Sequence, residues 1–566
     1  MIEPNNPNTR ARRVLGTWHA ATERAVRTCS VRRMRLRRAA AIVVATLVVI
    51  ATFAAAPPAS VAEGEDPPVA KPIQNWFGQT HVERYIGTPH TPNPAVGQKP
   101  PQHPYMAGNG SNTMHGDSYT SGAHAEAGPL GVNPKVTTAS FRPIGGQCAT
   151  VAFDSQGRIV TVCAGFDGFD LRLLDPVTLG EYTSMSLPQR PSTIEALLTF
   201  DLQKIFTDTS GGAYFYLDNQ DRAVLVDAFQ QLRVIGVVGD TGSPRFEQVA
   251  GYNLLPYLER DCWKFPTNMN PSGNCDVVSA VMPDWDGNYW WVSRFGVVGV
   301  VDRLTGGVQT LQLEGEEIQN SFATAADGVY IVSDHAMYRF EAGPSGAPQY
   351  TWREEYERGT GTKPGQINQG SGSSPTLIGD DIVAITDNDD PINVLFLKRD
   401  PAYAGDRVLC EQQVFEAGRG VTDNSLVGYG NSVVVENNYG YQNFLTLLFG
   451  NTVTGGLTKV DLVQTPSGAH ECEIAWTSVE RSPSTVPKLS VASGLVYVYT
   501  KPAQQFWIDA WYFTAIDWHT GETAYKVLTG TGWNFDNNWS PMTVGPGGVG
   551  YAGTFNGLVN VIDTPG

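Results

Sequence analysis

From about residue 141 to the end of the chain, apolar and polar positions alternate in short runs separated by turns centred on Gly or Asp. A period of two residues, without the spacing of an amphipathic helix, predicts β-strands. Eight units each contain a turn glycine at the equivalent position, from Gly157 in the first unit to Gly548 in the last, and these positions recur with a mean period of about 56 residues. The pattern predicts the second strand of each unit at residues 158–165, 213–218, 288–293, 329–334, 381–387, 432–437, 495–500 and 549–554.

Several short strands in each repeated unit indicate the blades of a β-propeller. The last unit has only three predicted strands, at 542–544, 549–553 and 558–562, and residues 136–141 can supply the missing edge strand. Such a splice leaves no open sheet edge in the ring. The sequence therefore predicts an all-β fold, an eight-bladed propeller over residues 135–566 closed by an N-terminal strand, with seven blades or paired β-sandwiches as alternatives.

The N-terminal part has a different pattern. Five arginines within residues 32–38 precede an unbroken apolar run at 39–56, and small residues follow at 60–62. This layout predicts that residues 1–62 are a secretory signal peptide or an N-terminal membrane anchor, and that the chain meets a membrane only there. Residues 63–134 are rich in Pro, Gly and His, and we expect them to form an irregular strap on the propeller. The body is then extracytoplasmic, either secreted or anchored to the cell membrane.

Charge and cysteine content agree with export. The formal net charge is −17, and because residues 1–62 hold ten Arg and two Glu, the remainder is near −25. This acidity argues against nucleic-acid binding. Six cysteines follow the targeting segment, and an even number in an oxidising compartment predicts three disulfides. Six cysteines can pair in fifteen ways, and we predict that neighbours in the sequence pair: Cys148 with Cys163, Cys262 with Cys275, and Cys410 with Cys472.

The loops that follow the second strands and those that enter the next blades open on one face of a propeller, where they form a funnel. Acidic, amide and aromatic residues recur at these places, and the candidate ligand-binding residues are Asp334, Asp387, Asn388, Glu436, Asn437, Trp507, Trp533 and Trp539. Carboxylates could hold calcium there, with Asp334, Asp387 and Glu436 as the candidate ligands. Alternatively, the acids and the aromatic faces suit a sugar or another polyhydroxyl ligand. Turn preference alone also explains Asp and Asn at such positions.

Histidines concentrate in the strap. His115 and Asp117 place a base and a carboxylate two residues apart. If the strap crosses the funnel mouth, His115 could act as a general base or a metal ligand beside His335. A surface loop is the alternative, and the candidate catalytic residues are therefore only His115, Asp117 and His335.

Residues 515–523, AIDWHTGET, resemble the A-x-D-x-x-T-G-[KE] repeat of pyrroloquinoline-quinone-type propellers, and weaker copies begin at Asp175 and Asp302. The repeat describes a tight turn in which Asp accepts backbone hydrogen bonds and Gly has a positive φ. The resemblance implies a quinoprotein-like propeller fold. Cofactor-using members carry an adjacent Cys-Cys pair, which is absent from this sequence, so pyrroloquinoline quinone is not expected.

The sequence thus predicts an exported, membrane-tethered or secreted propeller that binds a small molecule, a glycan or a protein partner of the cell envelope. The alternative is an extracytoplasmic enzyme that uses the same funnel, as a calcium-assisted hydrolase or lyase or as a quinoprotein-like dehydrogenase.

Overall fold

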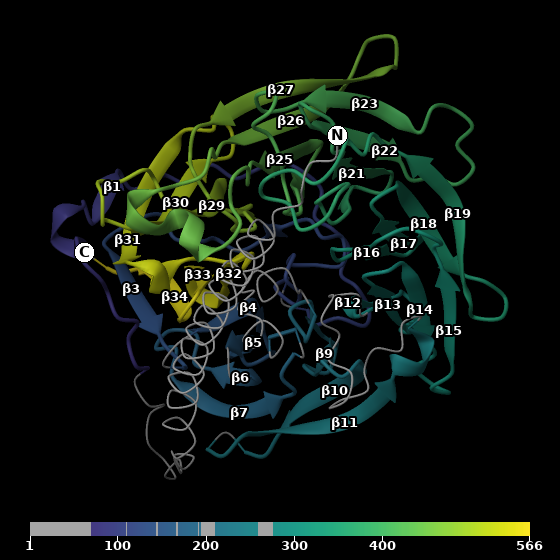
Figure 1. Ribbon diagram of the computed structural model, residues 1–566, viewed down its shortest axis with the longest axis horizontal. Helices are drawn as coiled ribbons and strands as arrows, with labels where there is room; N and C mark the ends of the chain where they lie inside the picture. The colour runs from purple at the N-terminus through teal and green to yellow at the C-terminus, as the bar shows by residue number, and fades with distance from the viewer. Residues whose placement is uncertain are drawn as a thin grey trace, which may run out of the picture. The chain divides into compact units, whose positions relative to one another are not determined.

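The computed structural model describes residues 70–108, 110–142, 145–165, 168–190, 192–193, 210–240, 242–258 and 276–565, which belong to one compact unit, Gly64–Gly566. Eight sheets follow one another around a ring, as an eight-bladed β-propeller (Figure 1). None of the helices within these ranges is long and apolar enough to cross a membrane. The predicted targeting segment, residues 1–62, lies outside the described residues.

Each blade is an antiparallel sheet whose first strand is the innermost. Blade 1 contains β4 (Gly145–Phe153), β5 (Ile159–Gly165), β6 (Gly168–Leu174) and β7 (Glu181–Leu187), and blade 2 contains β8 (Tyr216–Leu217), β9 (Ala223–Val226), β10 (Gln231–Val238) and β11 (Arg245–Asn253). Blade 3 contains β12 (Val278–Pro283), β13 (Tyr289–Ser293), β14 (Val297–Val301) and β15 (Val308–Gln312). Blade 4 contains β16 (Ala323–Ala325), β17 (Gly328–Val332), β18 (Ala336–Ala342) and β19 (Pro348–Glu355).

Blades 5 to 8 continue in the same order. Blade 5 contains β20 (Thr376–Ile378), β21 (Ile382–Thr386), β22 (Asn393–Lys398) and β23 (Val408–Gln413), and blade 6 contains β24 (Val427–Tyr429), β25 (Ser432–Glu436), β26 (Leu457–Gln464) and β27 (His470–Ser478). Blade 7 contains β28 (Lys488–Ser490), β29 (Leu495–Thr500), β30 (Ala510–Asp517) and β31 (Thr523–Thr531). Blade 8 contains β32 (Met542–Gly545), β33 (Val549–Thr554) and β34 (Gly557–Asp563), together with β3 (Pro134–Ala139). Short 3₁₀ turns are η1 (Gln79–His81), η2 (Leu255–Tyr257), η3 (Phe444–Gly450), η4 (Trp533–Phe535) and η5 (Pro546–Gly548).

Burial explains why the second and third strands have the clearest sequence signal. Every residue of β13 (YWWVS) and β29 (LVYVYT) is buried, because both faces of these strands pack against neighbouring blades. The outermost strand β27 alternates between half-buried and exposed residues over much of its length. The core therefore lies between the blades, in clusters that each combine strands of adjacent sheets.

The ring closes as the sequence predicts. β3 pairs antiparallel with β34, so that Val136 lies opposite Val561 and Ala139 lies opposite Leu558. The first and last parts of the propeller thus share one sheet, and blade 8 has no missing strand.

Blade 2 differs from the prediction. Residues 213–218, predicted as its second strand, contain its first strand, β8, and the second strand is β9. The two are confused because both are short apolar segments that end in Asp, at Asp218 and Asp227. The other seven predicted second strands coincide with β5, β13, β17, β21, β25, β29 and β33.

The turn chemistry inferred from the repeated motif is confirmed. Asp517 accepts hydrogen bonds from the backbone N–H groups of His519 and Thr520, at 2.8 and 2.9 Å, and Gly521 follows with a φ of +74°. Asp302 makes the corresponding contacts in blade 3, with Leu304 and Thr305. The motif therefore marks the turn between the third and fourth strands of a blade.

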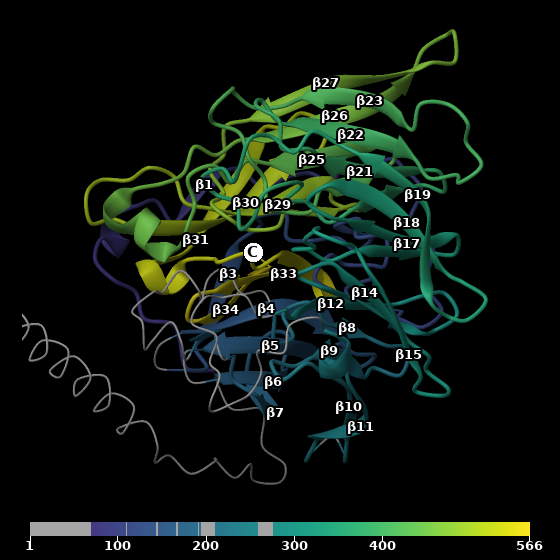
Figure 2. The same cartoon turned by 45° about the vertical axis from the view of Figure 1, so that its right-hand side comes forward.

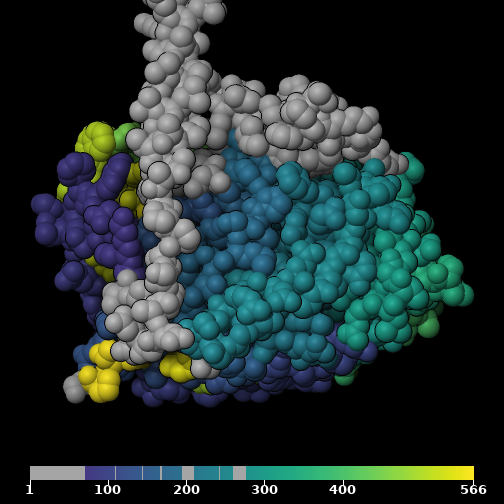
Figure 3. All heavy atoms as spheres, turned by 90° about the horizontal axis from the view of Figure 1, so that it is seen from below, coloured from purple at the N-terminus to yellow at the C-terminus, as the bar shows by residue number. Residues whose placement is uncertain are grey.

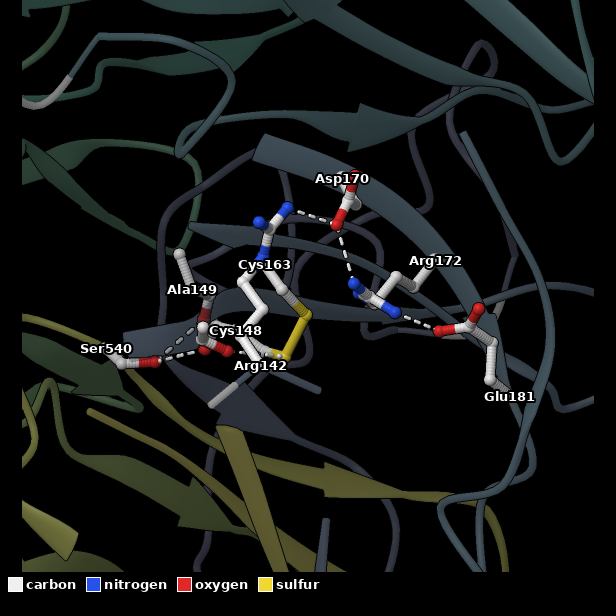
Figure 4. The surroundings of a disulfide bond; sticks show 9 residues. Arg142, Cys148, Ala149, Cys163, Asp170, Arg172, Glu181 and Ser540 are labelled. Carbon is white, nitrogen blue, oxygen red and sulfur yellow. Dashed lines mark hydrogen bonds and ion pairs between the residues drawn. A yellow bond between two sulfur atoms is a disulfide. The ribbon is translucent and has the colours of Figure 1, made fainter. Parts of the chain in front are cut away.

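Two of the three predicted disulfides are present, and the third, Cys262 with Cys275, lies outside the described residues. Cys148 and Cys163 are cross-strand neighbours in β4 and β5, with Cα atoms 3.9 Å apart. Figure 4 shows this bond beside the Ser540 hydroxyl, which donates to the carbonyls of Cys148 and Ala149. Cys410 and Cys472 join β23 to β27, the outer strands of blades 5 and 6, which lie side by side (Figures 1 and 2).

Replacing both Cys410 and Cys472 by alanine is expected to reduce the free energy of unfolding by about 4 kcal/mol, because the bond closes a long loop of the unfolded chain. The residues are 62 positions apart in sequence. Urea denaturation of the parent and the double variant measures the difference, and a loss below about 1 kcal/mol would contradict the expectation.

The strap is part of the same compact unit. It adds β1 (Tyr85–Gly87) to the outer edge of β31, and β2 (Ala123–His124) runs parallel to the innermost strand β28. The strap residues are purple in Figure 3, where they cover one side and follow the lower edge of the molecule. Blade 7 thereby becomes a sheet of six strands.

Candidate functional site

The strap closes one end of the central channel. Its residues 103–124, which we call the plug, accept hydrogen bonds from the first strands of several blades. Leu217, Thr324, Leu377, Gly428 and Leu489 donate their backbone N–H groups to the carbonyls of Asn112, Ser118, Tyr119, Ser121 and Gly122, respectively, at 2.8 to 2.9 Å. The plug thus replaces water as the partner of the innermost strands.

The plug enters from the face opposite to the funnel. Asn219, in the turn between the first and second strands of blade 2, donates to the Tyr105 carbonyl, and His103 lies 4.9 Å from Trp285 in the equivalent turn of blade 3. The plug, which carries His115, therefore does not cross the funnel mouth. The strap carries no periodic signal, and its position depends on these tertiary contacts alone.

His115 reaches from the plug to the start of the first strands. Its Nδ1 lies 2.8 Å from the Ser425 hydroxyl and its Nε2 lies 3.3 Å from the Ser374 hydroxyl. Burial, followed by the positive charge of Lys488, lowers the pKa of His115 well below its ordinary value. His335 instead bonds Asp334 and is partly exposed. The two histidines therefore have separate surroundings, and His115 is a buried, neutral residue of the channel.

Two buried ionisable groups, Asp117 and Lys488, lie near His115. Asp117 accepts hydrogen bonds from the Ser121 hydroxyl at 2.5 Å and from the Tyr119 N–H at 3.0 Å, and burial raises its pKa. Lys488, the first residue of β28, has no hydrogen-bond partner for its Nζ among the described residues, and burial lowers its pKa to about 7. Burial and the Lys488 charge lower the pKa of His124 to about 3. The plug is thus anchored by groups that burial drives toward their neutral forms.

Asp334 joins two funnel loops. Its Oδ1 accepts hydrogen bonds from the Glu317 N–H at 2.7 Å and contacts His335 Nδ1 at 2.8 Å, and its Oδ2 pairs with the Arg358 guanidinium at 2.6 Å. Both oxygens are therefore committed to the loops that surround β17. This arrangement fixes the funnel wall and leaves little of the carboxylate for a ligand.

Asp387 and Asn388 also hold loops. Asp387 accepts hydrogen bonds from the backbone and side-chain N–H groups of Asn393, at 2.7 and 2.6 Å, across the connection between β21 and β22. Burial raises its pKa to about 6. Asn388 donates to the Arg358 carbonyl at 2.8 Å and accepts from Gln366 at 3.0 Å. These contacts explain why an Asp-Asn pair follows this strand.

Glu436 and Asn437 end β25 inside the funnel. Glu436 Oε2 accepts a hydrogen bond from Asn424 Nδ2 at 2.7 Å, while its Oε1 has no partner within the described part of the chain. Burial raises the pKa of Glu436 to about 8. Asn437 bonds the backbone of Val421 and Arg419, at 3.2 and 2.9 Å. Glu436 is therefore the one of these acids that keeps a buried oxygen unpaired.

The candidate calcium ligands Asp334, Asp387 and Glu436 do not form one site. Among the described residues, no group of three or more His, Cys, Asp or Glu side chains is placed to hold a metal ion. Each carboxylate instead belongs to the connection that follows its own second strand. Equivalent positions in successive blades place side chains around a ring, and this separates them rather than bringing them together.

Two of the candidate tryptophans meet in an aromatic pocket on the funnel face. The pocket has a volume of about 320 Å³, and it is lined by Trp76, Phe77, Phe444, Leu448, Phe449, Trp507, Asp509, Gly532 and Trp533. The Trp533 ring lies 5.3 Å from that of Phe444, and the Trp507 ring lies 4.4 Å from that of Phe449. Its walls come from the strap, from η3 and from the loops of blade 7.

The pocket is pre-formed by its single acidic residue. Asp509 accepts a hydrogen bond from the Gly450 N–H at 2.8 Å and pairs with Lys501 at 3.1 Å. This contact ties η3 of blade 6 to the loop of blade 7 that carries Trp507. The pocket therefore does not need to be assembled when a ligand arrives.

Trp539 does not line this pocket. Its ring packs edge-to-face on Tyr441 at 5.5 Å, and the Tyr441 hydroxyl donates to Asn538 at 3.0 Å. It supports the entry to blade 8.

Much of the pocket wall was not predicted from the sequence. Trp76 and Phe77 were assigned only to the strap, and η3 was not singled out. The available signal was FLTLLFG, the sequence of η3, which is an apolar run inside a loop that is otherwise polar. The strap contribution could not be found from spacing.

No family model matches the chain, and no curated protein matches it. Solved structures that resemble it are β-propellers. Sqt1 from Chaetomium thermophilum has a TM-score of 0.42 at 11% identity, over 81% of this chain and 98% of that chain. The Cps50 (Swd1) propeller domain from Myceliophteria thermophila has a TM-score of 0.36 at 7% identity, over 76% of this chain and 100% of that chain. BamB from Moraxella catarrhalis has a TM-score of 0.33 at 13% identity, over 63% of this chain and 92% of that chain. The quinone-type family resemblance stays a prediction.

Proposed function

We propose that this chain is a partner-binding β-propeller whose aromatic pocket receives an apolar group of the partner. The observation that carries the proposal is the exposure of the pocket walls, since Phe77 is 76% exposed, Trp507 is 52% exposed and Trp76 is 45% exposed. Large aromatic side chains that cluster on a surface in this way mark binding sites, and aromatic residues in pockets dominate binding energy. The rigid link through Asp509 supports the same proposal.

The partner class we propose first is a protein, because the pocket is lined almost wholly by carbon. A glycan of the cell envelope is the second candidate, favoured by the partly exposed rings of Trp76 and Trp507, on which sugar rings can stack. We further propose that binding occurs outside the cytoplasm. The two disulfide bonds support that location, because such bonds persist in oxidising compartments.

The test measures how much of the full-length chain sediments with envelope fragments of the source cell. Trp507→Ala is expected to weaken retention at least tenfold, because it removes an exposed wall of the pocket. Protease treatment of the fragments should abolish retention if the partner is a protein. Periodate oxidation of sugar diols should abolish it if the partner is a glycan.

Phe229→Ala is the matched control. Phe229 is 48% exposed and lies in the turn after β9 of blade 2, and it does not line the aromatic pocket. This variant should be retained like the parent. Equal retention of Trp507→Ala and the parent, or equal losses in both variants, would remove the pocket from the proposal.

A further inference from the structure

A second and larger cavity lies between the strap and the outer strands of blades 7 and 8. This groove, of about 770 Å³, separates blade 7 from blade 8. Val136 of β3 and Val527 and Leu528 of β31 provide apolar walls. The strap borders the groove through the residues around β1. Its volume falls in the range of small-molecule sites in proteins.

Among the described residues that line the groove, Arg84 is the only charged one. Its guanidinium has no ion-pair partner among the described residues, although its carbonyl accepts a hydrogen bond from the Leu528 N–H at 2.9 Å. A guanidinium stays charged at any working pH and presents a planar set of donors that matches a carboxylate.

Tyr85 provides a second donor. Its hydroxyl is buried and has no hydrogen-bond partner in the described part of the chain, and its ring stacks on Tyr525 with centroids 6.1 Å apart. The nearby Asp563 carboxylate accepts from the N–H groups of Leu130, Gly131 and Val132, at 2.6 to 3.1 Å. Burial and the Asp563 charge raise the pKa of Tyr85, so the hydroxyl keeps its proton. A buried donor without an acceptor is costly, and a ligand oxygen would satisfy it.

We propose that this rim groove binds a carboxylate carried on an apolar chain, with the carboxylate at Arg84 and Tyr85 and the chain against Val136, Val527 and Leu528. A single cation balances a single negative charge, which favours a carboxylate over a doubly charged phosphate. The same chemistry occurs in a free aliphatic acid and in the C-terminus of an apolar polypeptide. No described residue lines both this groove and the aromatic pocket.

Isothermal titration calorimetry on the full chain tests the proposal with octanoate, octanamide, and an octapeptide ending in apolar residues as a free acid or an amide. At least one carboxylate should bind, and its amide should bind at least tenfold more weakly. Binding of octanoate alone identifies the free acid as the ligand class, and binding of the peptide alone identifies a polypeptide C-terminus.

Arg84→Gln should weaken the carboxylate at least tenfold, and Tyr85→Phe should weaken it about threefold or more. Val136→Trp, which fills the groove, should abolish binding. Arg245→Gln is the control, because Arg245 is exposed on β11 of blade 2 and pairs only with Glu247 among the described residues. Equal affinity for acid and amide, no binding of either acid, or an Arg84→Gln variant that binds like the parent would overturn the proposal. Trp507→Ala should leave this binding unchanged, so that the two sites are tested separately.

Discussion

Replacing Asp117 by alanine is expected to lower the free energy of unfolding by about 3 to 5 kcal/mol at pH 6, because it removes the partner of a buried charge. Asp117 is the acidic group that raises the pKa of Lys488, and it also accepts three hydrogen bonds within the plug, from Ser121 and Tyr119. Without it, these donors lose their acceptor and the Lys488 ammonium loses a nearby negative charge.

The loss should shrink as the pH rises above 7. The pKa of Lys488 is about 7 in the folded chain and near 10.5 when unfolded, so the unfolded chain holds more protons between these values. Stability linked to Lys488 therefore increases with pH from about 7 to 10.5, and the penalty is complete below pH 7. Removing Asp117 lowers the pKa of Lys488 in the folded chain further. The loss of stability linked to Lys488 therefore grows only below about pH 7, where the parent already carries a charged Lys488.

Urea denaturation at pH 6 and pH 9 measures both effects. Lys488→Met is the control, because it removes the ammonium and keeps a side chain of similar length. The double variant Asp117→Ala/Lys488→Met should recover at least half of the loss seen with Asp117→Ala alone, since an apolar pair replaces an incomplete ionic one. Additive losses in the double variant would show that the two side chains do not interact.

The blades could be predicted from the sequence because the second and third strands of each blade are packed between neighbouring blades. β13 and β29 are buried on both faces, which demands continuous β-branched and aromatic runs. The closing strand β3 followed from the incomplete last unit. Blade 2 was misassigned because β8 has only two residues, and so short a strand cannot be told from a longer one by pattern.

The candidate site was predicted less completely, because its contacts link distant parts of the chain. Asp334 is held by Arg358, 24 residues away, and His115 is held by Ser425, 310 residues away. Nothing in the local pattern around these residues indicates their partners. The aromatic pocket was found in part, through Trp507 and Trp533, because large aromatic residues in loops are informative by themselves.

Glu436 provides the second large effect, with the opposite sign. Its pKa is about 8 in the folded chain against an ordinary value near 4.5, because burial disfavours the charged form. The folded chain therefore holds more protons than the unfolded chain between these two values, and stability falls as the pH rises from about 4.5 to 8. The full difference is about 5 kcal/mol at most, at 1.36 kcal/mol per pH unit.

Glu436→Gln is expected to remove this dependence, because the amide is neutral at every pH and its oxygen can accept the hydrogen bond from Asn424. At pH 9 the variant should be more stable than the parent by several kcal/mol, and at pH 4 the two should be nearly equal. Glu471→Gln, at an exposed position of β27 in the same blade, should leave the pH dependence unchanged. Urea denaturation between pH 4 and 9 measures the three proteins, and a parallel pH dependence of Glu436→Gln and the parent would show that Glu436 is ionised in the folded chain. Because the Glu436 carboxyl is mostly neutral at pH 7, it acts as a hydrogen-bonding group of the funnel wall rather than as a charged ligand.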